Sequence, residues 1–269
     1  MSDNPTSAKQ SRLAVSSNNV DRRGFLGSVS AAAAVVLAPG VALIGLAEAR
    51  SAGGPVTESK RWGMLIDANK CTRGCDACVS ACGGGNGLVS HNRPQTDVQW
   101  MRKVTVRDKV HDSGSKGDYP RHQVSLPVMC QHCQYPPCVD VCPTGASFRR
   151  EDGIVLVDRH ICIGCRYCMM ACPYKARSFA HEVAIKQKAH APRGKGTVEA
   201  CTLCVHRIDE GLGRMPACVE ACASEGRGAM VFGDLKDPDS QISISLRDYP
   251  SAALRNDLGL YPGVRYQGI

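Results

Sequence analysis

The chain has 269 residues, a formal net charge of +8 at pH 7 and sixteen cysteines, but only four phenylalanines and two tryptophans. With so few large aromatic side chains, the hydrophobic core is thin for one or two domains. Bonds to metal or cross-links must therefore contribute to folding. Outside residues 28–47 no segment approaches the run of about 20 apolar residues that spans a bilayer, which excludes a polytopic membrane protein.

Residues 1–49 are predicted to be an export signal. The motif Arg22-Arg23-Gly-Phe-Leu26 precedes an Ala- and Gly-rich apolar stretch over 28–47, and Ala47-Glu-Ala49 offers a cleavage site that leaves Arg50 as the first mature residue. An arginine pair also occurs in ordinary secretory signals. The Phe-Leu pair at this offset favours the twin-arginine route, which exports folded proteins to the periplasm.

Short strands are expected along the rest of the chain, because apolar residues alternate or run together in stretches of five to ten residues. These strands cover 62–66, 99–108, 122–129, 153–158 and 228–233. Residues 110–121 are expected to form a charged surface loop, the basic run 186–195 a solvated loop, and residues 236–269 a mostly irregular C-terminal tail. A strand, a cysteine loop and a short helical turn thus recur along the chain as an internal repeat.

The sixteen cysteines fall into four groups of four, with none left over. The groups are Cys71, Cys75, Cys78, Cys82; Cys130, Cys133, Cys138, Cys142; Cys162, Cys165, Cys168, Cys172; and Cys201, Cys204, Cys218, Cys222. The third group has the Cys-x2-Cys-x2-Cys-x3-Cys-Pro spacing with which bacterial ferredoxins hold a [4Fe–4S] cluster. Four groups therefore predict four [4Fe–4S] clusters.

Disulfides and zinc are the alternatives. A cysteine-rich exported protein usually carries disulfides, and two Cys-x-x-Cys units can close a tetrahedral zinc site. Neither requires a tight loop followed by Cys-x3-Cys in all four groups, nor the additional Cys168 and Pro173 of the third group. Iron–sulfur clusters are therefore favoured.

The gaps between groups predict which cysteines share a cluster. The second and third groups are closest in sequence and both end in Cys-Pro, so they are paired in an inner module, and the first and fourth groups in an outer one. In two-cluster ferredoxins the last cysteine of each group binds the other cluster. This rule predicts set 1 as Cys71, Cys75, Cys78, Cys222; set 2 as Cys82, Cys201, Cys204, Cys218; set 3 as Cys130, Cys133, Cys138, Cys172; and set 4 as Cys142, Cys162, Cys165, Cys168.

The expected fold is α+β, with two nested bacterial-ferredoxin-like modules of short strands and short helices around four clusters, joined by irregular loops. The outer module covers 50–121 with 184–235, and the inner module covers 122–183. Four clusters with their thiolates carry about −8 in total, which almost neutralises the mature chain and speaks against a nucleic-acid partner. Nothing pairs Asp76, Asp140 or Asp158 with a nucleophile, so catalysis is not expected. His132 is expected to be structural or solvent-facing.

Several segments resemble the four-cluster ferredoxin-like subunits of bacterial respiratory complexes. They are Arg61-Trp-Gly-Met-Leu-Ile-Asp67, Cys75-Asp-Ala-Cys-Val-Ser-Ala-Cys82, Cys130-Gln-His-Cys-Gln-Tyr-Pro-Pro-Cys138 and Cys201-Thr-Leu-Cys-Val-His-Arg-Ile-Asp209. The twin-arginine signal makes the chain most similar to the periplasmic DsrO-type subunit of the membrane complex associated with dissimilatory sulfite reductase.

The resemblance implies an electron-transfer subunit, peripherally attached to the inner membrane through its partners. Those partners would be an integral quinone-interacting protein and a multihaem cytochrome c, in a complex linked to sulfur metabolism. The same relay could instead serve a thiosulfate, tetrathionate or nitrite reductase. A secreted protein stabilised by zinc or disulfides is the alternative of another class.

Overall fold

The computed structural model describes residues 56–72, 74–107, 123–211 and 214–269. The predicted export signal over 1–49 and the predicted surface loop over 110–121 lie outside these residues. Within them, no helix combines the length and the hydrophobicity needed to cross a membrane.

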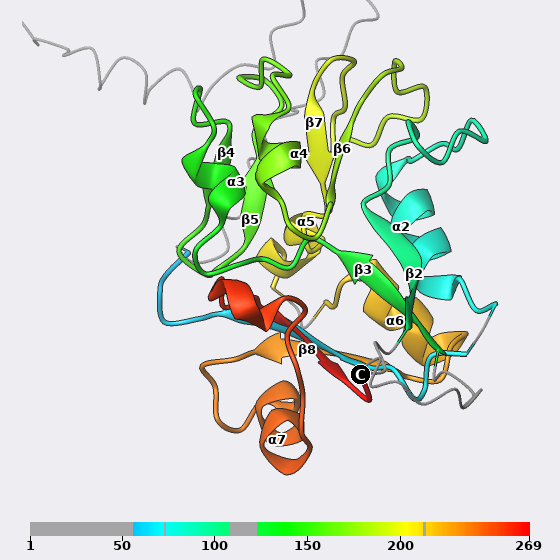
Figure 1. Cartoon of the computed structure of the whole chain (residues 1–269), viewed down its shortest axis with the longest axis vertical. Helices are drawn as coiled ribbons and strands as arrows, with labels where there is room; N and C mark the ends of the chain where they lie inside the picture. Colours follow the sequence, from blue (N-terminus) through cyan, green and yellow to red (C-terminus); the bar gives the residue numbers. More distant parts are fainter. Residues whose placement is uncertain (1–55, 73, 108–122, 212–213) are drawn as a thin grey trace, which may run out of the picture. The chain divides into compact units, whose positions relative to one another are not determined.

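A three-stranded sheet joins the two ends of the described chain (Figure 1). Its central strand β1 (Trp62–Asp67) pairs antiparallel with β8 (Met230–Asp234) and parallel with β9 (Val264–Gln267). Met64, Leu65 and Ile66 are all buried, as expected for a central strand with apolar residues on both faces. The predicted strands over 62–66 and 228–233 are confirmed.

Three antiparallel strand pairs complete the β-structure. They are β2 (Met101–Arg107) with β3 (Gln123–Met129), β4 (Ser147–Arg149) with β5 (Val155–Val157), and β6 (Arg177–Phe179) with β7 (Val198–Ala200). The predicted strands over 99–108, 122–129 and 153–158 correspond to β2, β3 and β5. The β2–β3 and β6–β7 pairs each join a segment of the predicted inner module to one of the outer module.

Short helices carry the closely spaced cysteines or, in the case of α5, begin directly after one. They are α2 (Ala77–Asn86), α3 (Pro137–Asp140), α4 (Tyr167–Ala171), α5 (Val205–Asp209) and α6 (Ala217–Ser224). On α2 and α6 the two cysteines are four residues apart, which places both on one face of each helix. Helix α2 packs against α6, and α3 against α4. The cysteines themselves form much of the hydrophobic core.

The C-terminal tail over 236–269, predicted to be mostly irregular, has more regular structure than expected. This segment contains α7 (Gln241–Asp248), the 3-10 helix η1 (Asn256–Leu258) and β9. Helix α7 begins where the Ser240 hydroxyl accepts a hydrogen bond from the Ser243 N–H. Strand β9 buries Val264 and Tyr266 on one face. The mixture of short strands and short helices agrees with the expected α+β class.

Candidate metal centres

All sixteen cysteines are free thiols in the structure. They stand in tight loops, within short helices or at helix ends, and several of these loops contain residues with positive φ. In the third group, Gly164 has φ +71°, and a Cβ there would lie 2.2 Å from the carbonyl oxygen of Gly196. Only glycine fits this position, so the sequence Cys-Ile-Gly-Cys lets the loop turn inward towards β7.

Set 1 surrounds a cavity at the start of α2. Cys71, Cys75 and Cys78 line it together with Cys222 of α6, and Lys103 of β2 lies at its edge. The pKa of Cys78 is raised to about 11, by burial first, with Lys103 opposing and the nearby thiols of Cys222, Cys71 and Cys75 adding to the shift. The structure therefore brings together all four members of this predicted set.

Set 4 surrounds a second cavity, near α4. Cys142, Cys162, Cys165 and Cys168 line it, together with Arg177 of β6. Backbone N–H groups point at the sulfurs: that of Ser147 donates to Cys142 Sγ at 3.4 Å and that of Val198 to Cys162 Sγ at 3.5 Å. Burial raises the pKa of Cys142, but hydrogen bonds from Ser147 and Thr144 outweigh it and the pKa is lowered.

The members of set 2 are neighbours in the interior. Burial raises the pKa of Cys201 well above its usual value, and the thiols of Cys82, Cys218 and Cys204 add to the effect. Cys82 has its pKa raised to about 12, by burial first and then by Cys204, while the side chain of Asn86 opposes the shift through a hydrogen bond. Set 2 thus unites cysteines from α2 with those around α5 and α6.

Set 3 is likewise buried. The pKa of Cys133 is raised to about 12, by burial first and then by the thiols of Cys138 and Cys172. Cys130 also has its pKa raised to about 12, by burial first, with Arg177 opposing and Cys138 and Cys133 adding to the shift. The chain thus brings Cys172, at the end of α4, to the loop of the second group.

The four sets fit [4Fe–4S] clusters chemically. Thiolate is the ligand form of cysteine, and the raised pKa values mean that bound iron must displace the thiol protons. In the part of the chain that the structure describes, no three or more His, Cys, Asp or Glu side chains converge closely enough to hold a single metal ion. In sets 1 and 4 the sulfurs instead surround a space, as the corners of a cluster require.

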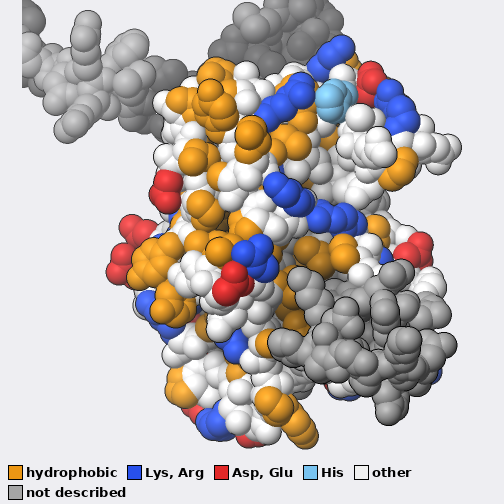
Figure 2. All heavy atoms as spheres, viewed as in Figure 1, with side chains coloured by type: hydrophobic (Ala, Val, Ile, Leu, Met, Phe, Trp, Pro, Cys, Tyr) orange, Lys and Arg blue, Asp and Glu red, His pale blue; other side chains and the backbone are white. Residues whose placement is uncertain are grey.

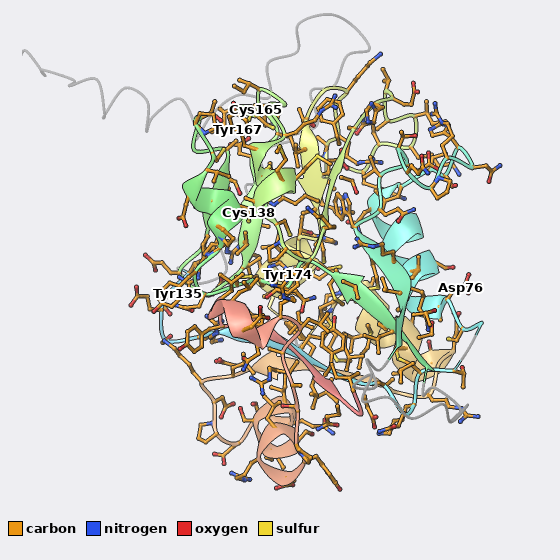
Figure 3. The ribbon with its side chains drawn as sticks, viewed as in Figure 1. Asp76, Tyr135, Cys138, Cys165, Tyr167 and Tyr174 are labelled. Carbon is orange, nitrogen blue, oxygen red and sulfur yellow. The ribbon has the colours of Figure 1, made fainter. Side chains whose placement is uncertain are left out.

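Burial separates the four sets into two kinds. Every cysteine of sets 2 and 3 is buried, whereas all cysteines with partial or full exposure belong to set 1 or set 4: Cys71, Cys75, Cys142, Cys162 and Cys165. Neighbouring sets are in electrostatic contact, Cys78 of set 1 with Cys82 of set 2, and Cys168 of set 4 with Cys138 of set 3. In Figure 3, Cys165 lies at the outer end of this region and Cys138 deeper within it.

Two other residues complete these sites. His132 is buried, and its Nδ1 accepts the Val155 N–H at 3.0 Å; burial lowers its pKa to about 3, so it is a neutral structural residue rather than a solvent-facing one. Arg177 contacts the sulfurs directly, with Nη2 3.0 Å from Cys138 Sγ. Burial lowers the pKa of Arg177, but the thiols of Cys138, Cys130 and Cys168 outweigh this and raise it. Sequence reasoning did not identify Arg177, because an arginine five residues after a cysteine group carries no signal by itself.

Comparison with known proteins agrees with this chemistry. Residues 122–235 match a family described as a 4Fe-4S dicluster domain. The chain is 40% identical to the Hdr-like menaquinol oxidoreductase iron-sulfur subunit 1 of Archaeoglobus fulgidus, over 92% of this chain and 97% of that protein. It is 39% identical to a tetrathionate reductase subunit of Salmonella typhimurium, over 87% and 84% of the two chains, and to a sulfite dehydrogenase subunit of Allochromatium vinosum, over 76% and 81%.

Relatives of this similarity and coverage exclude a secreted zinc- or disulfide-stabilised protein. One of them is named an iron–sulfur subunit of an oxidoreductase, and the other two are named subunits of a reductase and of a dehydrogenase. With the match to the 4Fe-4S dicluster domain and sixteen cysteines, the cofactors of this chain are four [4Fe–4S] clusters. The protein belongs to the family of iron–sulfur subunits of respiratory complexes, and it transfers electrons without catalysing a reaction itself.

Proposed function

We propose that sets 1 to 4 each hold one [4Fe–4S] cluster and form a linear relay, in which electrons enter and leave through sets 1 and 4. The observation that carries this proposal is the burial of every cysteine in sets 2 and 3 and the exposure confined to sets 1 and 4. A partner protein can approach only the clusters near the surface. The electrostatic contacts between sets 1 and 2 and between sets 3 and 4 support this order within each pair of sets.

The nested modules follow from the same sets. Sets 1 and 2 use cysteines on both sides of the segment 122–183, and the packing of α2 on α6 and the pairing of β1 with β8 support an outer module from 50–121 and 184–235. Sets 3 and 4 use cysteines from the second and third groups alone, as an inner module over 122–183 requires. The strand pairs β2–β3 and β6–β7 then join the modules.

Set 4 is proposed as the end that meets a redox partner. Ile163, Tyr167 and Met170 are 67%, 58% and 75% exposed around the exposed Cys165. Figure 2 shows hydrophobic side chains among Lys and Arg over α3 and α4, and Figure 3 shows Tyr167 beside Cys165. An exposed apolar surface around an accessible cluster is the kind of surface that a protein partner covers.

The partners proposed are an integral membrane quinone-interacting protein and a periplasmic multihaem cytochrome c, in a complex linked to dissimilatory sulfur metabolism. The similarity to a menaquinol oxidoreductase subunit along almost the whole chain supports the quinone side. The arginine pair at Arg22 and Arg23 supports export of the folded holoprotein to the periplasm, with attachment to the inner membrane through the partners.

Anaerobic affinity purification of the tagged chain from detergent-solubilised membranes of its host tests this function. The expected result is a brown complex with about sixteen irons per chain, an integral membrane protein and a c-type cytochrome. Recovery of the iron-loaded chain without any membrane protein contradicts the proposal.

The same relay serving a molybdopterin or cytochrome reductase is the second candidate. The similarity to a tetrathionate reductase subunit and to NrfC proteins favours it. In the same purification, a large molybdopterin-containing protein in place of the c-type cytochrome assigns the chain to this second function.

A further inference from the structure

Arg177 is a buried cation without a carboxylate partner. It is 5% exposed, it remains protonated in a protein interior, and a buried charge requires compensation. Arg193 shows the usual solution, because its Nε donates to the buried carboxylate of Glu199 at 2.8 Å. Among the salt bridges formed by the described residues, none includes Arg177.

Arg177 lies close to sulfurs of two different sets. Its Nη2 donates to Cys138 Sγ of set 3 at 3.0 Å, while Ser147 Oγ, 2.7 Å from the same nitrogen, fixes its direction. It also lines one cavity with Cys168 of set 4 and interacts electrostatically with that thiol. The guanidinium lines the cavity that set 4 surrounds. It therefore lies between the two cluster sites of the inner module.

The other terminal nitrogen of Arg177 lacks an acceptor among the described residues. Nη1 is buried and has no hydrogen-bond partner in the structure. A buried donor is rarely left without an acceptor, and the cavity that the guanidinium lines is also lined by the four cysteines of set 4. A cluster with its thiolates and sulfides is an anion rich in acceptors, and it would satisfy this donor.

We propose that Arg177 is a positioning residue for two clusters at once, holding a fixed positive charge between those of sets 3 and 4 and donating a hydrogen bond to the Cys138 thiolate of set 3. This inference rests on the ligand sets proposed above. Reduction adds one negative charge to a cluster, so a neighbouring cation and its hydrogen bonds stabilise the reduced form and raise the reduction potential. Arg177 thereby raises both potentials together, which keeps the electron step between these two clusters balanced.

EPR-monitored redox titration of the anaerobically purified holoprotein tests this role. Arg177→Gln removes the charge and Arg177→Lys keeps it. Arg102→Gln is the matched control, because Arg102 donates to the carbonyl oxygens of Tyr174 and Lys175 in the same region, and among the described residues no hydrogen bond joins it to a sulfur. In Arg177→Gln we expect two of the four midpoint potentials to fall, with wild-type iron content, while Arg177→Lys restores them and Arg102→Gln leaves all four unchanged. Four unchanged midpoints in an iron-replete Arg177→Gln protein overturn the proposal.

A second measurement uses the wild-type sequence in case Arg177→Gln does not assemble its clusters. Pulsed EPR on protein labelled with ¹⁵N-arginine should detect a nitrogen hyperfine coupling on a reduced cluster, and Arg177→Lys should abolish that coupling. Absence of an arginine coupling in an iron-replete protein overturns the role of Arg177 and leaves the relay standing. A wild-type protein that lacks iron refutes the proposed function instead.

Discussion

Cys71 and Cys222 line one cavity although they belong to the first and last cysteine groups of the chain. The packing of α2 against α6 creates this contact, because both helices carry cysteines on their facing sides. In the proposed sets, the exchange of the last cysteine between paired groups therefore follows from helix packing. Substitution of single cysteines tests which residues share a cluster.

Cys222→Ser should remove the same cluster as Cys75→Ser, although Cys222 is only four residues from Cys218 of set 2. Loss of a thiolate removes one corner of the cluster, so iron should fall from about sixteen to about twelve per chain in each variant. EPR spectra of the two reduced variants should lack the same signal, while Cys218→Ser should lack a different one. If the spectrum of Cys222→Ser matched that of Cys218→Ser, the proposed sets would be wrong.

The exposed end at set 4 predicts a separation between cluster content and partner binding. Ile163→Glu places a charge on the surface around Cys165 without touching a sulfur ligand. We expect wild-type iron content but at least a tenfold weaker association with membranes, because a buried charge at an interface costs more than about 1.4 kcal/mol. Co-sedimentation of the purified variant with stripped host membranes measures this association.

Ile244→Glu is the control for the docking prediction. Ile244 is 38% exposed on α7, which packs on β8 and β1, so its substitution should leave membrane association unchanged. Equal binding of Ile163→Glu and the wild type would place the partner at the other end of the relay, at set 1.

The cysteine groups and the exchange rule of two-cluster ferredoxins predicted sets whose members lie near one another in the structure. Which cluster each cysteine binds stays a prediction, and the joining of residues as distant in sequence as Cys71 and Cys222 came from that rule and not from local spacing. The β6–β7 pair and β9 were missed, since strands of three or four residues gain their stability from partners distant in sequence. Helix α7 could have been found from Ser240, a residue type that commonly begins a helix.

The basic run over 186–195 shows where charge patterns mislead. Lys186, Lys188 and Lys195 are exposed as expected, but the side chain of Arg193 is only 7% exposed and pairs with the fully buried Glu199. A sequence pattern of basic residues does not reveal which one finds a buried carboxylate, because Glu199 lies within a strand that was itself not predicted.

Substitution of Glu199 should have a large effect on stability at a site away from the sulfurs. Its Oε2 accepts hydrogen bonds from Trp100 Nε1 at 3.0 Å and from Arg193 Nε at 2.8 Å, and it thereby joins β7 to the start of β2. Glu199→Ala leaves the Arg193 charge unpaired, which should destabilise the protein by roughly 3–5 kcal/mol. Faster loss of visible absorbance in guanidinium measures this effect. Glu199→Gln keeps an acceptor and should bleach at an intermediate rate; a wild-type rate for Glu199→Ala contradicts the expectation.

The contacts of Tyr266 predict that the C-terminal tail stabilises the cysteine loop of set 3. Its hydroxyl donates to the carbonyl oxygen of Pro127 at 3.1 Å and accepts from Gln131 Nε2 at 3.2 Å, and Gln131 lies between Cys130 and Cys133. Tyr266→Phe removes one hydrogen bond from each of these buried groups and should destabilise the protein by about 1–2 kcal/mol. Tyr266→Ala should cost about 3–5 kcal/mol through the cavity it creates.

Substitution of Tyr266 should destabilise the neighbouring cysteine loop as well as the whole protein. The Gly263 N–H also donates to the carbonyl oxygen of Gln131, at 2.9 Å, so β9 holds the loop of the second cysteine group in place. During anaerobic unfolding of Tyr266→Phe, the EPR signal that Cys133→Ser abolishes should therefore disappear before the other three. Tyr261→Phe is the matched control, since Tyr261 is 67% exposed in the same tail. Simultaneous loss of all four signals in Tyr266→Phe would show that β9 stabilises the fold as a whole and not this loop.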